Sequence, residues 1–158
     1  MSGAFRIEIQ FAARKPWAPS SRRLRCWASA ALAGGAGPRG PACAVVSVQV
    51  VGTRRSRALN ARYRGRHKPT NVLSFAGAGR LPGGEHWLGE IVICAPVLAQ
   101  EAREQNKPVA AHWAHITVHG VLHLLGFDHQ QPRQACKMES IETQILENMG
   151  FSNPYGRF

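Results

Sequence analysis

Three histidines in the last third of the chain have the spacing of metal ligands. They are His119, His123 and His129, within the segment HGVLHLLGFDH. Residues four apart on a helix lie on one face, so His119 and His123 can present two imidazoles to one ion. Gly126 favours a left-handed turn just past the helix, which would bring His129 to the third corner. Three neutral imidazoles with an open fourth position describe a catalytic zinc site.

Gly120, the residue that follows His119, argues against a protease function for such a site. Zinc proteases of the metzincin class have the same histidine spacing, but they place a glutamate base where this chain has Gly120. Loss of a general base lowers a rate by on the order of 10²–10⁴. Asp128 is a nearby carboxylate with two open roles, orientation of an imidazole from behind or direct proton transfer. A phosphodiesterase, by contrast, needs cations near the metal more than a second carboxylate.

The remaining histidines and the cysteines are not expected to bind the metal. His112 and His115 lie on the same predicted helix, and we interpret them as hydrogen-bonded core residues or as supports of the ligands. His67 and His86 lie in predicted loops. The four cysteines contain no CxxC pair, which argues against a cysteine metal site.

The charge of the chain is unevenly distributed along its length. Residues 1–80 carry fifteen Lys and Arg and one acid, whereas residues 81–158 carry five Lys and Arg and eight acids. The two halves are therefore +14 and −3, which together give the net +11. A strongly basic half favours a polyanionic partner through phosphate contacts and counterion release. We therefore expect a nucleic acid as partner.

Hydrophobic periodicity predicts the elements that must position these residues. Strands are expected at 5–11, 45–51, 71–77 and 87–95, and helices at 21–34, 54–63, 96–106, 108–125 and 132–149. The first helix should end at Gly34 and be followed by a flexible loop over 33–42. Residues 109–125 are apolar on all sides except for the histidines, so their helix should be the buried central one. Strands first and helices mostly last is an α+β order.

The length and the apolar segments limit the class of protein. A chain of 158 residues fits one domain, which we take to be 1–158. No apolar run approaches the roughly 20 residues of a membrane helix. The N-terminus MSGAFRIEIQF alternates apolar and polar residues, unlike a signal peptide. A cytoplasmic protein without a membrane partner is the expectation.

Four segments resemble one known family. They are LNARYRGRHKPTNVLSF (59–75), LGEIVICAPV (88–97), AHWAHITVHGVLHLLGFDH (111–129) and MGFSNPY (149–155). From Ser47 to Tyr155 the chain resembles the YbeY family of bacterial rRNA-maturation endoribonucleases, and the HGxLHLxGxDH pattern is specific to that family. Residues 1–46 match only as a strand followed by a helix. Departures at His67, Ala76 and Glu90 leave the three histidines untouched.

The resemblance implies a fold, a metal and a reaction. The fold would be α+β, with a mixed sheet of about four strands packed by about five helices and the metal on the central helix. One zinc ion would be held by His119, His123 and His129, and Arg64 would face the metal cleft and bind RNA phosphate. The implied reaction is single-strand-specific RNA cleavage in small-subunit rRNA 3′-end maturation and ribosome quality control. Its partners would be rRNA and the small ribosomal subunit.

Arg64 has modest support from the residues themselves. It lies in a run with Arg62, Arg66 and Lys68, and a guanidinium grips phosphate through two parallel hydrogen bonds. Two other functions stay open beside the endoribonuclease. One is a non-catalytic, zinc-containing ribosome assembly factor. The other, less favoured because of Gly120, is a metzincin-like zinc peptidase.

Overall fold

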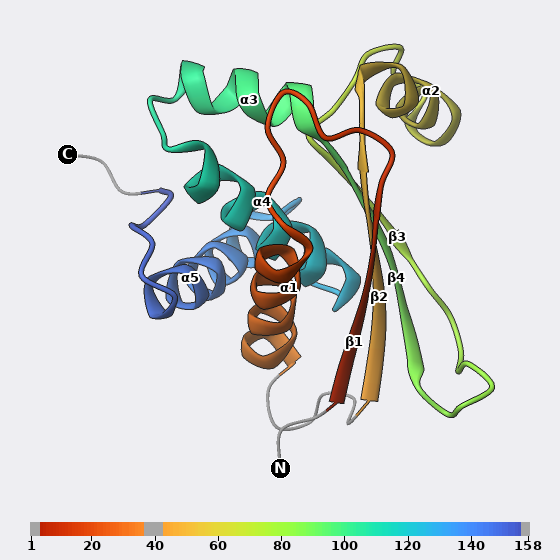
Figure 1. Cartoon of the computed structure of the whole chain (residues 1–158). Helices are drawn as coiled ribbons and strands as arrows, with labels where there is room; N and C mark the ends of the chain where they lie inside the picture. Colours follow the sequence, from red (N-terminus) through yellow and green to blue (C-terminus); the bar gives the residue numbers. More distant parts are fainter. Residues whose placement is uncertain (1–3, 37–42, 156–158) are drawn as a thin grey trace.

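A mixed four-stranded sheet with helices on both faces forms the described part of the chain, residues 4–36 and 43–155 of a computed structural model (Figure 1). The strands are β1 (Ala4–Phe11), β2 (Cys43–Val51), β3 (Val72–Ala76) and β4 (His86–Cys94). The helices are α1 (Ser21–Ala36), α2 (Thr53–Arg64), α3 (Ala95–Glu104), α4 (Val109–Leu124) and α5 (Pro132–Asn148). The α+β class and the four strands and five helices expected from the sequence are thereby confirmed.

The sheet has the strand order β1-β2-β4-β3. β1 pairs with β2, and β2 with β4, in parallel, whereas β3 pairs antiparallel with β4 at the edge. A parallel pair needs a crossover connection, which α1 supplies between β1 and β2. β3 and β4 are consecutive and need only the Gly- and Pro-rich loop between them. The sheet is therefore mixed because its last two strands form a hairpin.

The main core lies between the sheet and three helices. α1, α4 and α5 gather on one side of the sheet, while α2 lies on the other (Figure 1). One face of β2 and the apolar stripe of α1 are buried: Val46, Val48, Val50, Leu24, Trp27, Ala28, Ala31 and Leu32. Ten residues of α4 are buried, so the prediction of a central helix is confirmed. The second face carries a smaller cluster built from Val51, Leu73, Val92 and Cys94.

The end of the first helix differs from the prediction. α1 continues through Gly34 to Ala36, so the predicted loop starts later than residue 33, and residues 37–42 lie outside the described residues. A Cβ added to Gly34 would lie 2.6 Å from Ile145 Cγ1, and one added to Gly35 would lie 2.4 Å from Leu122 Cδ2. Both glycines thus allow α1 to approach α5 and α4 closely. Their role is packing, which helix-stop signals do not reveal.

The end of α2 and the length of the helices are two further features of the fold. Gly65 adopts a left-handed conformation with φ 67° and ends α2. Among the helices of the described residues, none combines the length and the apolar character that crossing a membrane requires.

Candidate metal centre

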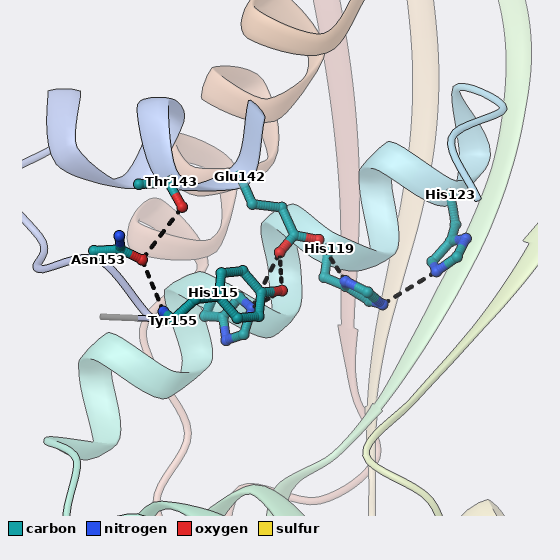
Figure 2. Close-up of polar contacts among 7 residues, drawn as sticks. All are labelled: His115, His119, His123, Glu142, Thr143, Asn153 and Tyr155. Atoms are coloured by element: carbon teal, nitrogen blue, oxygen red, sulfur yellow. Dashed lines mark hydrogen bonds and ion pairs between the residues drawn. The ribbon is translucent and has the colours of Figure 1, made fainter. Parts of the chain in front are cut away.

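His119 and His123 face one another in the C-terminal half of α4 and are both half-buried. They are four residues apart, and their ring centroids lie 4.6 Å from each other. The two Nε2 atoms are separated by 3.1 Å (Figure 2). The pair forms because residues at i and i+4 lie one turn apart on the same side of a helix. The two imidazoles thus lie side by side, as the i, i+4 spacing predicted.

A glycine turn brings the third histidine to the pair. Gly126 has φ 98°, in the region that favours glycine, and its N–H donates to His123 O at 3.0 Å. The chain then doubles back, and the ring of His129 lies 5.4 Å from that of His119 and 5.0 Å from that of His123, between centroids. One ligand atom from each of the three residues lies within 4.8 Å of the others. The structure therefore gathers the three histidines that the spacing selected.

The donor set fits a zinc ion. Two nitrogens bound tetrahedrally at about 2.0–2.1 Å would be roughly 3.3 Å apart, close to the 3.1 Å between His119 Nε2 and His123 Nε2. Burial lowers the pKa of His123, and the neighbouring His119 and His129 lower it further. The neutral imidazole, which is the form that binds metals, is thereby favoured. His129 is exposed, so one side of the cluster is open to a substrate.

Gly120 faces the sheet and not the histidines. A Cβ at this position would lie 3.1 Å from Val72 Cγ2 and 3.2 Å from Ile91 Cγ2. The carbonyl oxygen of Gly120 accepts a hydrogen bond from Ser74 Oγ at 3.0 Å. A glutamate here would begin by pointing into the apolar layer between α4 and β3, so this helix is not placed to present a protease base at that position.

A buried carboxylate that sequence reasoning missed supports the cluster from behind. Glu142 on α5 is fully buried, and its Oε1 lies 2.5 Å from His119 Nδ1 (Figure 2). Its Oε2 lies 3.2 Å from His115 Nε2 and contacts the Tyr155 hydroxyl. Burial alone raises the pKa of Glu142, but the hydrogen bonds from His115 and His119 outweigh it and lower the pKa to about 2. The carboxylate is therefore ionised at neutral pH and accepts all three bonds.

One signal in the sequence pointed to this residue. Glu142 follows Met138 by four positions and therefore lies in the apolar stripe of α5, where a charged residue needs a partner. Burial and the adjacent carboxylate raise the pKa of Tyr155, so its hydroxyl keeps the proton that it donates to Glu142. Nothing in the sequence identifies His119 as the partner of Glu142, because the two residues belong to different helices.

Of the other histidines, His67, His112 and His115 are placed as the sequence analysis expected, whereas His86, expected in a loop, is the first residue of β4. His112 is buried with its Nε2 at 2.9 Å from Glu101 Oε1, and His115 bonds Glu142. His67 and His86 are exposed and belong to neither group of candidate ligands found among the described residues.

Asp128 contacts the backbone beside the metal centre. Its Oδ1 accepts the hydrogen bond of the His129 N–H at 2.7 Å. This bond stabilises the turn that presents His129. The two roles considered for Asp128 were orientation of an imidazole and direct proton transfer. The observed hydrogen bond to the backbone is a third contact, separate from both roles.

Arg64 is the last residue of α2 and is exposed. It lines a cavity of about 270 Å³ together with eight residues: Asn60, Arg66, Lys68, Pro69, Thr70, Asn71, Val97 and Glu101. None of His119, His123 and His129 lines this cavity. The structure thus gathers Arg64 with Arg66 and Lys68 around one cavity.

Comparison with known proteins identifies the family. A family model described as Endoribonuclease YbeY matches residues 21–150. The Endoribonuclease YbeY of Alkalilimnicola ehrlichii is 49% identical over 156 residues, covering 96% of this chain and 92% of that protein. The solution structure of TM1509 from Thermotoga maritima has the same fold, with a TM-score of 0.58 at 23% identity over 96% of this chain and 99% of that one. With the histidine cluster formed on α4, the family model and the relative show that this chain belongs to the endoribonuclease YbeY family.

Proposed function

We propose that the chain is a zinc-dependent endoribonuclease that cuts single-stranded RNA. The observation that carries the proposal is the convergence of His119, His123 and His129 with one open side, in a chain of an endoribonuclease family. We infer that the cleavage serves 3′-end maturation of small-subunit rRNA and ribosome quality control. The protein would then act in the cytoplasm, with rRNA and the small ribosomal subunit as partners.

Zinc is the metal that this donor set favours. Three neutral imidazoles and one open position are typical of catalytic zinc. When bound, the ion would act as a Lewis acid and lower the pKa of a coordinated water to about 7. The residues of the chain would hold that ion: His119 and His123 from α4, and His129 from the turn after it. The bond from the His129 N–H to Asp128 keeps that turn in place.

Arg64 is proposed to bind a phosphate of the RNA. Its guanidinium is exposed at the end of α2 and shares a cavity with Arg66 and Lys68. We infer that a single-stranded RNA contacts this cavity and the histidine cluster together. Cations that hold phosphates stabilise the charge that builds up during phosphodiester cleavage. Asp128 remains a candidate for proton transfer beside His129.

Two observations weigh on the alternatives. A peptidase needs a general base, and the site where metzincins carry it is occupied by Gly120, which packs against Val72 and Ile91. A structural zinc site is usually closed by four protein ligands. The cluster here offers three histidines, and His129 is exposed. The geometry therefore favours catalysis over the non-catalytic assembly factor.

The test is metal content and cleavage in the same preparations. The wild type, loaded with zinc, should hold about one ion per chain and cut single-stranded RNA in a single-turnover assay. His123→Ala should lose tight zinc binding and at least about a hundredfold in cleavage rate, since a catalytic metal contributes several kcal/mol. The control is His67→Ala, an exposed histidine outside the cluster.

Each alternative has its own outcome. Full zinc content in His123→Ala would remove the ligand assignment. A wild type that binds zinc and rRNA but cuts no RNA would favour the assembly factor. Chelator-sensitive hydrolysis of casein by the wild type would favour the peptidase.

A further inference from the structure

Glu142 and Tyr155 form a network behind the candidate metal ligands. Glu142 is fully buried and joins residues of α4 and of the segment after α5 (Figure 2). We propose that Glu142 and Tyr155 are positioning residues, which hold His119 with its proton on Nδ1 and its Nε2 lone pair directed at the metal position. The proposal rests on the proposed metal centre and adds the C-terminal segment to it.

The direction of the hydrogen bond decides which nitrogen of His119 is free. A carboxylate has no proton to give, so His119 Nδ1 must be the donor to Glu142 Oε1 at 2.5 Å. The neutral ring then carries its lone pair on Nε2, which points toward His123 Nε2. Partners of this kind fix the tautomer and the ring orientation of a metal-binding histidine. The side chain of His119 is 22% exposed, so solvent alone does not orient it.

Tyr155 holds the carboxylate from the other side. Its hydroxyl donates to Glu142 Oε2, which also accepts from His115 Nε2 at 3.2 Å. With both oxygens engaged, the carboxylate cannot rotate away from His119. The second nitrogen of His115, Nδ1, is buried and has no hydrogen-bond partner among the residues that the structure describes. That ring is therefore suited to donate from Nε2 in its neutral form, so the network has one consistent set of donors.

A turn after α5 places Tyr155 at this position. Asn153 Oδ1 accepts from the backbone N–H of Tyr155 at 2.8 Å and from Thr143 Oγ1 at 3.3 Å. Thr143 is the neighbour of Glu142 on α5, so the turn is fastened beside the carboxylate that it supports (Figure 2). Residues 151–155 are thus connected to His119 on α4 through two side chains, those of Tyr155 and Glu142.

A second metal ion is the competing explanation for this cluster. Ligand atoms of His115, His119 and Glu142 lie within 4.8 Å of one another. However, the short contact between His119 Nδ1 and Glu142 Oε1 and the Tyr155 hydroxyl on Oε2 already satisfy these atoms. We therefore interpret the cluster as hydrogen-bonded, with one metal position per chain.

The first experiment measures zinc affinity by competition with a chromophoric chelator. Glu142→Gln should raise the zinc Kd by about 10–100-fold, the usual effect of losing an outer partner. Tyr155→Phe removes only the hydroxyl and should raise the Kd by about three- to tenfold. The controls are Tyr63→Phe, at the only other tyrosine, and Glu147→Gln, an exposed residue of α5. Both controls should keep the wild-type Kd.

The second experiment reads the tautomer of His119 in metal-free protein by ¹⁵N NMR. The wild type should show a protonated Nδ1 and an unprotonated Nε2, and Glu142→Gln should show a mixture of the two neutral forms. A structural role alone would leave this signature unchanged. Tyr155→Phe alters no buried charge. If Glu142→Gln does not fold, the zinc Kd and the His119 tautomer of Tyr155→Phe test the proposal.

The outcomes separate this proposal from the proposed function. Tight zinc binding with unchanged Kd values in both variants would overturn the positioning role and leave the metal centre intact. Two zinc ions per wild-type chain, or a proton on Nε2 of His119 in the metal-free wild type, would also overturn it. A wild type that binds no zinc would refute the metal centre, while the NMR spectrum would still report whether Glu142 sets the tautomer.

Discussion

At the scale of single residues, the chemistry depends on which nitrogen of each imidazole is free. His119 has one ring nitrogen on Glu142 and the other facing His123. Burial lowers the pKa of His123, as do its two histidine neighbours, so the ring does not need to lose a proton to bind a cation near neutral pH. Glu142, which is not one of the three candidate ligands, thus orients His119, whereas burial and the two neighbouring histidines favour the neutral form of His123.

Arg64 is expected to act on chemistry more than on affinity. Arg64→Ala should lower single-turnover cleavage of single-stranded RNA by at least about tenfold, because a cation on the reacting phosphate matters most in the transition state. Arg64→Lys should recover only part of the rate, since lysine lacks the planar fork. RNA affinity by filter binding at two salt concentrations should change little, because other cations of residues 1–80 supply most of the attraction.

The matched control for Arg64 is Arg57→Ala. Arg57 is an exposed residue of the same helix that does not line the cationic cavity. Its loss should leave cleavage close to the wild-type rate. Wild-type cleavage by Arg64→Ala would exclude Arg64 from the site and direct attention to Lys68. If Arg64→Ala lost both its zinc and its RNA binding, Arg64 would have a structural role.

At the scale of elements, the close packing of α4 on the sheet explains the glycine in the metal motif. Gly120 lies over Val72 and Ile91, and its carbonyl oxygen bonds Ser74. The motif therefore has no base at this position because the helix needs a small residue there. His119 and His123, which precede and follow Gly120 on α4, remain partly exposed.

Gly120→Glu should destabilise the fold and create no peptidase. A carboxylate beside Val72 and Ile91 would be buried without a partner, and the free energy of unfolding should fall by about 3 kcal/mol or more. Gly120→Ala should cost about 2 kcal/mol at most, because a gain of about 1 kcal/mol in helix propensity offsets part of the overpacking. Urea unfolding and casein hydrolysis measure both effects. A folded Gly120→Glu variant with chelator-sensitive peptidase activity would contradict this account.

The contact between α3 and α4 should depend on pH. Burial raises the pKa of Glu101, but hydrogen bonds from His112 and Asn71 outweigh it, and the pKa lies below the usual 4.5. A lowered carboxyl pKa contributes stability that is present above pH 4.5 and lost as the pH falls below it. Glu101→Gln resembles the protonated form. Its free energy of unfolding should therefore be lower than that of the wild type at pH 7, and the difference should shrink between pH 4.5 and 3.

The control for this pH dependence is Glu147→Gln, an exposed carboxylate on α5. The difference between this variant and the wild type should be small at each pH, because solvent screens an exposed charge. Urea unfolding at pH 7, 4.5 and 3 provides the comparison. A difference for Glu101→Gln that grows as the pH falls would have the wrong sign and would refute the assignment.

At the scale of the whole molecule, the two halves of the chain differ in charge and in role. The +14 half, residues 1–80, contributes three of the four strands and the cationic cavity residues Arg64, Arg66 and Lys68. The −3 half contributes the metal helix, its turn and the supporting Glu142. The residues proposed to attract RNA and those proposed to hold the metal therefore come from different parts of the sequence.

Removal of the metal should lower the stability of the whole domain. A metal held by His119, His123 and His129 would join the turn Gly126–His129 to α4, so its binding energy would contribute to folding. At free zinc about a thousandfold above Kd the contribution is about 4 kcal/mol, which corresponds to roughly 10 °C in Tm for a chain of this length. Thermal unfolding with and without EDTA measures it. His123→Ala should be insensitive to the chelator, and an equally insensitive wild type would argue against a bound metal.

The sequence by itself determined the features that depend on neighbours along the chain. The i, i+4 spacing placed His119 and His123 on one face of α4, and Gly126 predicted the turn that returns His129. Alternation and apolar stripes predicted the strands and helices within a few residues. These signals are reliable because helix geometry and glycine conformations are local properties of the backbone.

Only the tertiary structure decided which distant residues meet. Glu142 reaches His119 across 23 positions, and Tyr155 reaches His115 across 40. Gly34 predicted a helix end, yet α1 runs on because the glycine is needed for contact with Ile145. Periodicity tells which face of a helix is buried, but the partner on that face is set by how helices and sheet pack together, and that packing is a property of the whole chain.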